Sequence, residues 1–224
     1  MKVVSLGCGL GGGLQEFLKR GGEHFGDHIL RIPYEQCLGI DKDPKFKDDI
    51  TGQEFLFQAF DYMNEDPGVL ALLPETDYYL AWNCLHMSPS KEWANALVQV
   101  MMHKARKGVW VRLLSFENDE ATGEGVLQRI GLRFAWTKGD PEPLPYTLKD
   151  CVDSINEYKK TDSKRNCITG RVKPGKRLRS TDDPKVVPIS APPGVTRYEP
   201  KLGFRRTQGF VPPLVAEWEI IINV

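Results

Sequence analysis

Short apolar runs alternate with amphipathic stretches along most of this chain. Apolar runs of about four to eight residues, closed by glycine, proline or an acid, predict buried strands, and apolar residues three and four positions apart predict helices. The predicted strands are residues 3–6, 37–40, 55–61, 77–82, 109–116, 132–137 and 215–224. Strands that alternate with helices predict an α/β fold with a mostly parallel sheet, whose ligand site lies at the carboxyl ends of the strands.

The clearest helix follows the fourth predicted strand. Its apolar face is formed by Trp93, Ala96, Leu97, Val100 and Met101, which fall at helical spacing. Gly108 is predicted to end this helix, because glycine commonly occupies the position after a helical C-terminus. Further helices are predicted over residues 120–130 and 148–158.

The composition changes after residue 139. Residues 140–213 are rich in proline and basic residues, and residues 149–210 contain 15 basic and 7 acidic side chains, a net charge of +8 (15 − 7). We therefore predict a doubly wound, mostly parallel seven-stranded sheet with a basic insertion before the last strand. The predicted domains are 1–139 plus 214–224 for the sheet and 140–213 for the insertion.

Overall composition excludes several classes of protein. The 224 residues include 30 basic and 30 acidic side chains, so net charge identifies no partner. The five cysteines never form a CxxC pair, which argues against a disulfide framework or a zinc knuckle and favours a reducing, cytoplasmic location. This cysteine spacing also predicts no metal site. No apolar run reaches the length of a membrane span, so no membrane partner is predicted.

The candidate chemistry begins directly after the first strand. Gly7, Gly9 and Gly12 satisfy the pattern GxGxxG, with Gly11 and Gly13 between and after them. Such a turn accepts positive φ and brings free N–H groups close to a ligand. The second and third predicted strands each close on an acid, Asp41 and Asp61, in the place where α/β nucleotide folds hydrogen-bond a ribose.

In the order and spacing of these features, residues 3–137 resemble the class I S-adenosylmethionine methyltransferases. The resemblance implies S-adenosylmethionine as the cofactor, held by the turn of Gly7, Gly9 and Gly11. It also implies that Asp41 binds the ribose and Asp61 the adenine amino group. The structural alternative for Asp61 is a solvated strand end.

The segments after the fourth and fifth strands resemble the cytosine-5 DNA methyltransferases. Cys84 and Ser88 keep the spacing of that family's nucleophile motif, Glu117-Asn118 keeps two residues of its ENV motif, and residues 5–12 resemble its SLFSGxGG motif. By this resemblance Cys84 adds to carbon 6 of a flipped cytosine, and Glu117 relieves charge at the ring nitrogen.

The residues themselves leave alternatives open. Cys84 could be a buried structural thiol, and Glu117 an acid that favours a helix N-terminus. His86 could be a base or a satisfied histidine. The sequence departs from the cytosine-5 motifs at Gly7, Asn83 and Leu85.

These observations predict a methyltransferase that acts on nucleic acid, with carbon 5 of cytosine in DNA as the leading acceptor. The basic insertion, with interleaved tyrosine and phenylalanine, suits contact with phosphates and bases. The alternatives are a methyltransferase for RNA or a small molecule, an NAD-dependent oxidoreductase, or an inactive methyltransferase-like binding module. The sequence does not indicate an oligomeric state.

Overall fold

A computed structural model describes most of the predicted sheet domain. The described residues are 1–64, 66–82, 84–116, 144, 146–161, 168–177, 188–189, 195–198, 205–207 and 215–224. Glu117, the predicted helix 120–130 and the predicted strand 132–137 lie outside them.

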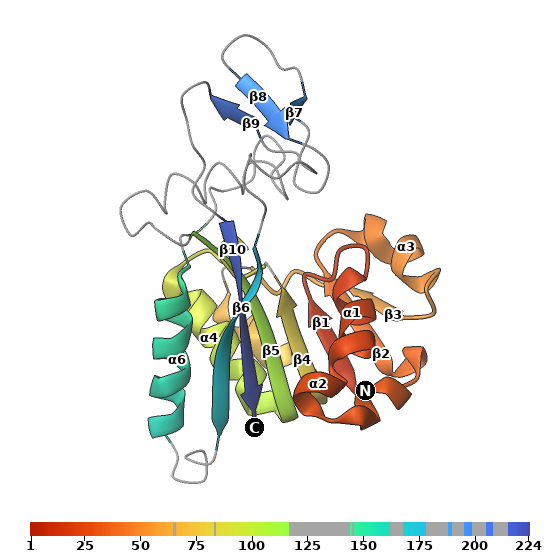
Figure 1. The fold of residues 1–224 in the computed structure, drawn as a ribbon. Coiled ribbons are helices and arrows are strands. Elements are labelled where there is room, and N and C mark those ends of the chain that lie inside the picture. The colour runs from red at the N-terminus through yellow and green to blue at the C-terminus, as the bar shows by residue number, and fades with distance from the viewer. Residues whose placement is uncertain are drawn as a thin grey trace.

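The core is a seven-stranded sheet with the order β3-β2-β1-β4-β5-β10-β6 (Figure 1). Its strands are β1 (Val3–Leu6), β2 (Cys37–Asp41), β3 (Leu56–Ala59), β4 (Thr76–Trp82), β5 (Ala105–Phe116), β6 (Thr169–Arg177) and β10 (Val215–Asn223). β1 to β5 pair in parallel, whereas β10 is antiparallel to both β5 and β6. The predicted α/β, mostly parallel seven-stranded sheet is therefore confirmed.

One strand of this sheet comes from an unexpected part of the chain. β6 falls inside the range 140–213, which the composition assigns to an insertion, yet it pairs with β10 along residues 169–177. The same range also contains a three-stranded sheet, made of β7 (Pro188–Ile189), β8 (Val195–Tyr198) and β9 (Arg205–Thr207). β6 therefore belongs to the main sheet, although it lies within the range assigned to the insertion.

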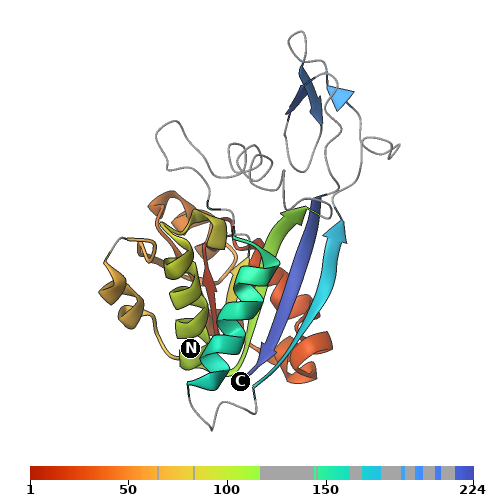
Figure 2. The same ribbon diagram turned by 90° about the vertical axis from the view of Figure 1, so that its left-hand side faces the viewer.

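Helices cover both faces of the sheet. The helices are α1 (Gly12–Arg20), α2 (Gly22–Phe25), α3 (Lys47–Thr51), α4 (Lys91–Lys104) and α6 (Leu148–Lys160). Short 3₁₀ turns lie in the connections between strands and helices, namely η1 (Asp27–Arg31), η2 (Tyr34–Gln36), η3 (Pro44–Phe46), η4 (Pro67–Leu72) and η5 (Leu85–Met87). Figure 2 shows α4 and α6 side by side on one face, with α1 and α2 on the other.

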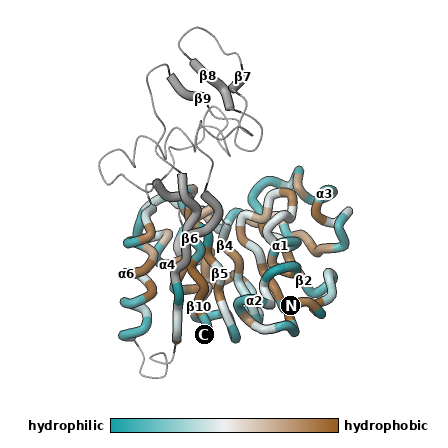
Figure 3. Tube along the Cα trace, viewed as in Figure 1, coloured by the Kyte–Doolittle hydropathy of each residue, from teal (hydrophilic) through white to brown (hydrophobic). Residues whose placement is uncertain are grey.

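Each face has its own apolar core. Val4, Leu97 and Ile155 belong to the cluster under α4 and α6, and Phe17 and Trp110 to the cluster under α1. Figure 3 shows apolar residues on the side of α6 that faces the sheet and hydrophilic residues on its outer side. Burial of these apolar faces is the main favourable contribution to a fold of this kind.

The predicted α4 is confirmed, but its predicted end is wrong. The Ser90 side chain caps its start by accepting from the Trp93 N–H at 3.1 Å, and the helix ends at Lys104. Gly108 lies within β5, where an added Cβ would be 2.4 Å from a ring carbon of Phe25. The glycine is needed there because an aromatic ring packs against the strand.

Within the described part of the chain, no helix combines the length and apolar character that a membrane span requires.

Candidate functional site

A glycine turn joins β1 to α1 at the carboxyl edge of the sheet. Gly7, Gly9 and Gly11 have φ values of +59°, +47° and +80°, a region in which a side chain costs roughly 1–2 kcal/mol. The Cys8 N–H donates to the Ile40 carbonyl of β2, and the Gly11 N–H donates to the Cys8 carbonyl. The sequence therefore needs glycine here for a backbone reason, and the turn leads directly into α1.

Asp41, at the end of β2, is bonded to this turn. The Gly9 N–H donates to Asp41 Oδ2 at 3.0 Å, and the Asp43 N–H donates to Asp41 Oδ1 at 3.1 Å. The two features that the sequence analysis placed 32 residues apart thus form one unit.

The turn packs tightly on one side and is open on the other. An added Cβ at Gly7 would be 2.8 Å from Cys84 Cβ and 3.0 Å from the Tyr62 hydroxyl. At Gly9 and Gly12 an added Cβ would meet no atom within 4 Å. This open side gives a ligand room to approach the backbone of the turn.

Asp61 lies at the same edge of the sheet. It follows β3 by two residues, and the preceding Phe60 N–H donates to the Asp41 carbonyl at 2.9 Å. The exposed Asp61 carboxylate accepts the Met63 N–H through Oδ1 at 3.0 Å. The structure therefore places Asp61 near Asp41 at the carboxyl edge of the sheet. The role of Asp61 in ligand binding stays a prediction.

Cys84 lies beneath the glycine turn rather than at an open surface. It is buried, and burial raises the pKa of its thiol to about 12, to which the nearby Asp41 carboxylate contributes. A hydrogen bond with the Tyr62 hydroxyl favours the thiolate and lowers this pKa, but it does not offset burial. At neutral pH this thiol is therefore protonated.

Sequence reasoning missed Tyr62. It is buried, its pKa is raised by burial, and its hydroxyl is hydrogen-bonded to Cys84 and lies close to Gly7. Its position directly after Asp61 is the signal that could have identified it. Tyr62 therefore packs with Cys84 against the buried side of the glycine turn.

The segment after β4 is also buried. Burial lowers the pKa of His86 to about 4, so its imidazole is neutral at physiological pH. The Leu144 N–H donates to the His86 carbonyl at 2.6 Å, and Ser88 Oγ contacts Met63 Sδ at 3.5 Å. Glu117 lies outside the described residues, although β5, which leads to it, pairs directly with β4. The predicted juxtaposition of Cys84 and Glu117 therefore stays a prediction.

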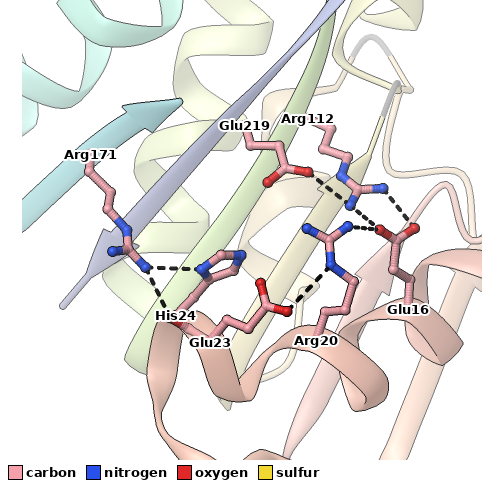
Figure 4. A network of polar contacts seen from close by, with 7 residues as sticks. All are labelled: Glu16, Arg20, Glu23, His24, Arg112, Arg171 and Glu219. Atoms are coloured by element: carbon pink, nitrogen blue, oxygen red, sulfur yellow. Dashed lines mark hydrogen bonds and ion pairs between the residues drawn. The ribbon is translucent and has the colours of Figure 1, made fainter. Parts of the chain in front are cut away.

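On the α1 face, β5 contributes a buried arginine that the sequence analysis did not consider. Arg112 Nη1 and Nη2 lie 3.0 and 2.5 Å from the two Glu16 carboxylate oxygens, and Nη2 also lies 3.0 Å from Glu219 Oε1 (Figure 4). The guanidinium stacks 3.6 Å from the centre of the Trp82 ring. A charged residue within the apolar run of β5 is the signal that could have indicated it.

The fold of this chain is similar to those of several solved structures. No family model and no curated protein matches the chain. The YcgJ protein of Bacillus subtilis aligns over 99% of this chain and 91% of its own, with a TM-score of 0.55 and 10% identity. A protein studied for the conversion of a disulfide bond into a thioacetal group during echinomycin biosynthesis aligns over 99% of this chain and 75% of its own, with a TM-score of 0.50 and 14% identity.

The chain has a Rossmann-like fold, with a mostly parallel seven-stranded sheet between helices. An S-adenosylmethionine-dependent methyltransferase from Methanosarcina mazei also aligns, over 99% of this chain and 91% of its own, with a TM-score of 0.48 and 12% identity. At such identities the similarity concerns the fold alone. The similarity to cytosine-5 DNA methyltransferases finds no support among these proteins.

Among the described residues, no cluster of three or more histidine, cysteine or acidic side chains is placed to hold a metal ion.

Proposed function

We propose that this protein binds S-adenosylmethionine and transfers its methyl group. The observation that carries the proposal is the Gly9 N–H bonded to Asp41 at 3.0 Å, because it joins the glycine turn and the acid of β2 into one nucleoside-binding unit. The Rossmann-like fold supports the same function.

The described residues fit this cofactor. The backbone at Gly9 and Gly12 is open to a ligand, and each Asp41 oxygen accepts a single described hydrogen bond. A carboxylate oxygen can accept about two, so both retain capacity for the two ribose hydroxyls. Asp61 would accept the adenine amino group through its second oxygen. The cofactor supplies an electrophilic methyl group on a sulfonium.

For the acceptor, we propose nucleic acid. The support is the net charge of +8 over residues 149–210, since lysine and arginine bind the phosphate backbone. Part of this charge lies on β6, at the edge of the main sheet. Phosphate contacts would hold the acceptor, while residues after β4 and β5 would face its reacting atom.

Cytosine carbon 5 in DNA stays the acceptor predicted by the sequence resemblance. This route requires Cys84 as a thiolate, and its pKa of about 12 in the unliganded protein weighs against it. The route is available only if binding of the base exposes or ionises the thiol. Otherwise the acceptor is another atom, in DNA, RNA or a small molecule, and Cys84 is structural.

Calorimetry on the full chain tests the cofactor. We expect saturable binding of S-adenosylmethionine and none of NAD. Binding of NAD alone would overturn the proposal and favour an oxidoreductase. Binding of S-adenosylmethionine without transfer of a labelled methyl group to duplex DNA, transfer RNA or small-molecule acceptors would instead favour an inactive binding module.

A trapping experiment tests the cytosine route. Duplex DNA that contains 5-fluorocytosine is incubated with the protein and S-adenosylmethionine, because fluorine blocks the last proton removal and leaves a covalent adduct. The route predicts an adduct that survives denaturation and is lost in Cys84→Ser. Methylation of unmodified nucleic acid by Cys84→Ser at the normal rate would show that Cys84 is structural.

A further inference from the structure

Arg112 is a buried charge on the strand that leads into the proposed acceptor site. Its side chain is 8% exposed, and it lies on the α1 face of β5, next to Trp82 in the paired register of β4 and β5. Moving a guanidinium out of water costs several kcal/mol before its partners repay it. A position with this cost calls for a physical explanation.

The partners of Arg112 come from three separate elements. Glu16, on α1, accepts two hydrogen bonds from the guanidinium, and Glu219, on β10, is held at 3.0 Å. Trp82, at the end of β4, stacks against the guanidinium plane at 3.6 Å. The hydrogen bonds from Arg112 also hold the pKa of Glu16 below its ordinary value, so this carboxylate is ionised at neutral pH.

Stability alone does not explain this arrangement. Replacing a buried ion network by apolar side chains is often neutral or stabilising, and β5 is otherwise apolar from residue 109 to 114 apart from Arg112. What the network does provide is orientation, because a planar guanidinium with two carboxylates and a stacked ring fixes all of its partners.

The partner that matters is α1. Its N-cap is Gly11, which gives no side-chain cap, and its first turn contains no acid. Glu16 lies about one turn into this helix and gives it a polar link to β5, beside the apolar contact of Phe17 with Trp110. The glycine turn runs straight into α1, so the orientation of the helix sets the direction of the N–H groups of the turn.

We propose that Arg112 is a positioning residue for S-adenosylmethionine. Through Glu16 it fixes α1, and with α1 the glycine turn, against β5 and β10. The identity of the ligand rests on the proposed function. The effect of Arg112 on the glycine turn without ligand does not.

The main variant is Glu16→Ala. Alanine favours a helix, and Arg112 keeps Glu219, so the fold is retained. We expect binding of S-adenosylmethionine to weaken about tenfold, or about 1.4 kcal/mol. Glu16→Gln, which keeps the length and one acceptor oxygen, should recover part of the affinity. Arg112→Lys should weaken binding too, because an ammonium cannot reproduce the paired hydrogen bonds.

Two controls separate positioning from stability. Arg20→Ala removes the other described partner of Glu16, at 2.6 Å, and should change affinity less than twofold. Tyr146→Phe removes a hydrogen bond to Asn95 on the opposite face of the sheet, and should lower the melting temperature without changing affinity.

A second measurement needs no ligand. Amide exchange and amide chemical shifts of residues 9–13 should change in Glu16→Ala and stay as in the wild type in Arg20→Ala. If the wild type fails to bind S-adenosylmethionine, the proposed function is wrong, and the amide measurement still tests the inference. Unchanged amides in Glu16→Ala would overturn it, as would an equal loss of affinity in Tyr146→Phe.

Discussion

At the residue scale, Gly7 combines two constraints that no other residue type can meet. Its φ of +59° is unfavourable for a side chain, and an added Cβ would be 2.8 Å from Cys84 Cβ. Gly7→Ala should lower the free energy of unfolding by more than about 2 kcal/mol, the sum of backbone strain and a clash against packed atoms. Urea denaturation measures this loss.

Gly9→Ala is the matched control for that prediction. Its φ is also positive, at +47°, but nothing lies within 4 Å of the added Cβ. Only the backbone strain remains, so this variant should lose about 1–2 kcal/mol. Equal destabilisation by the two variants would contradict the close packing of Gly7 on Cys84 and Tyr62.

Asp41 is expected to act on affinity rather than on the fold. Asp41→Ala removes the acceptor of the Gly9 N–H and the predicted acceptor of the ribose hydroxyls. Hydrogen bonds to a charged group contribute about 1.5–3 kcal/mol, so S-adenosylmethionine should bind roughly ten- to a hundredfold more weakly by calorimetry.

Asp43→Ala provides the comparison. Asp43 lies two residues away, and its side chain accepts from the Lys45 N–H and pairs with Lys45. Because these contacts are local and exposed, affinity should change less than twofold. A loss in Asp43→Ala as large as in Asp41→Ala would remove Asp41 from the cofactor site.

At the scale of elements, α6 shows that the segment after residue 140 contributes to the core. Thr147 and Asp150 form a capping box at its start, in which the Thr147 side chain accepts from the Asp150 N–H. Thr147→Ala should lower the free energy of unfolding by about 1 kcal/mol, measured in urea by the same cooperative transition as the rest of the sheet.

The control is Thr161→Ala at the other end of α6. Thr161 Oγ1 donates to the Tyr158 carbonyl within the last turn, where its removal leaves the backbone hydrogen bonds intact. A change within about 0.5 kcal/mol is expected. A separate, early transition in Thr147→Ala would mean that α6 unfolds independently of the sheet.

At the scale of the whole molecule, the charge distribution predicts how the protein meets its acceptor. Neutralising Lys173, Lys176, Arg177 and Arg179 should weaken nucleic-acid binding and flatten its salt dependence by about one unit of slope per lost phosphate contact. Fluorescence titrations at several salt concentrations measure both quantities.

Neutralising Lys19, Arg31 and Arg106 tests whether the effect is specific. These residues are exposed and lie outside the basic segment. Their replacement should leave the salt dependence unchanged. Wild-type binding that is absent at low salt, or indifferent to salt, would favour a small-molecule acceptor.

The sequence by itself determined the parts of this protein that depend on local chemistry. The apolar runs became β1, β2, β4 and β10 within about two residues of their predicted ends, because a buried strand needs a continuous apolar run. The run of glycines predicted the turn, because glycine alone tolerates positive φ freely. The position of Asp41 at the end of a predicted strand placed it at the carboxyl edge of the sheet.

Tertiary structure decided what depends on residues far apart in the chain. β6 contains glycine, proline and basic residues, so its side chains give no strand pattern, yet backbone hydrogen bonds to β10 bring it into the sheet. Gly108 looked like a helix end, but it lies within β5, where the ring of Phe25 leaves no room for a side chain. Arg112 binds Glu16, which lies 96 residues away in the chain. Such contacts depend on which elements become neighbours in the fold, and local sequence patterns do not predict these neighbours.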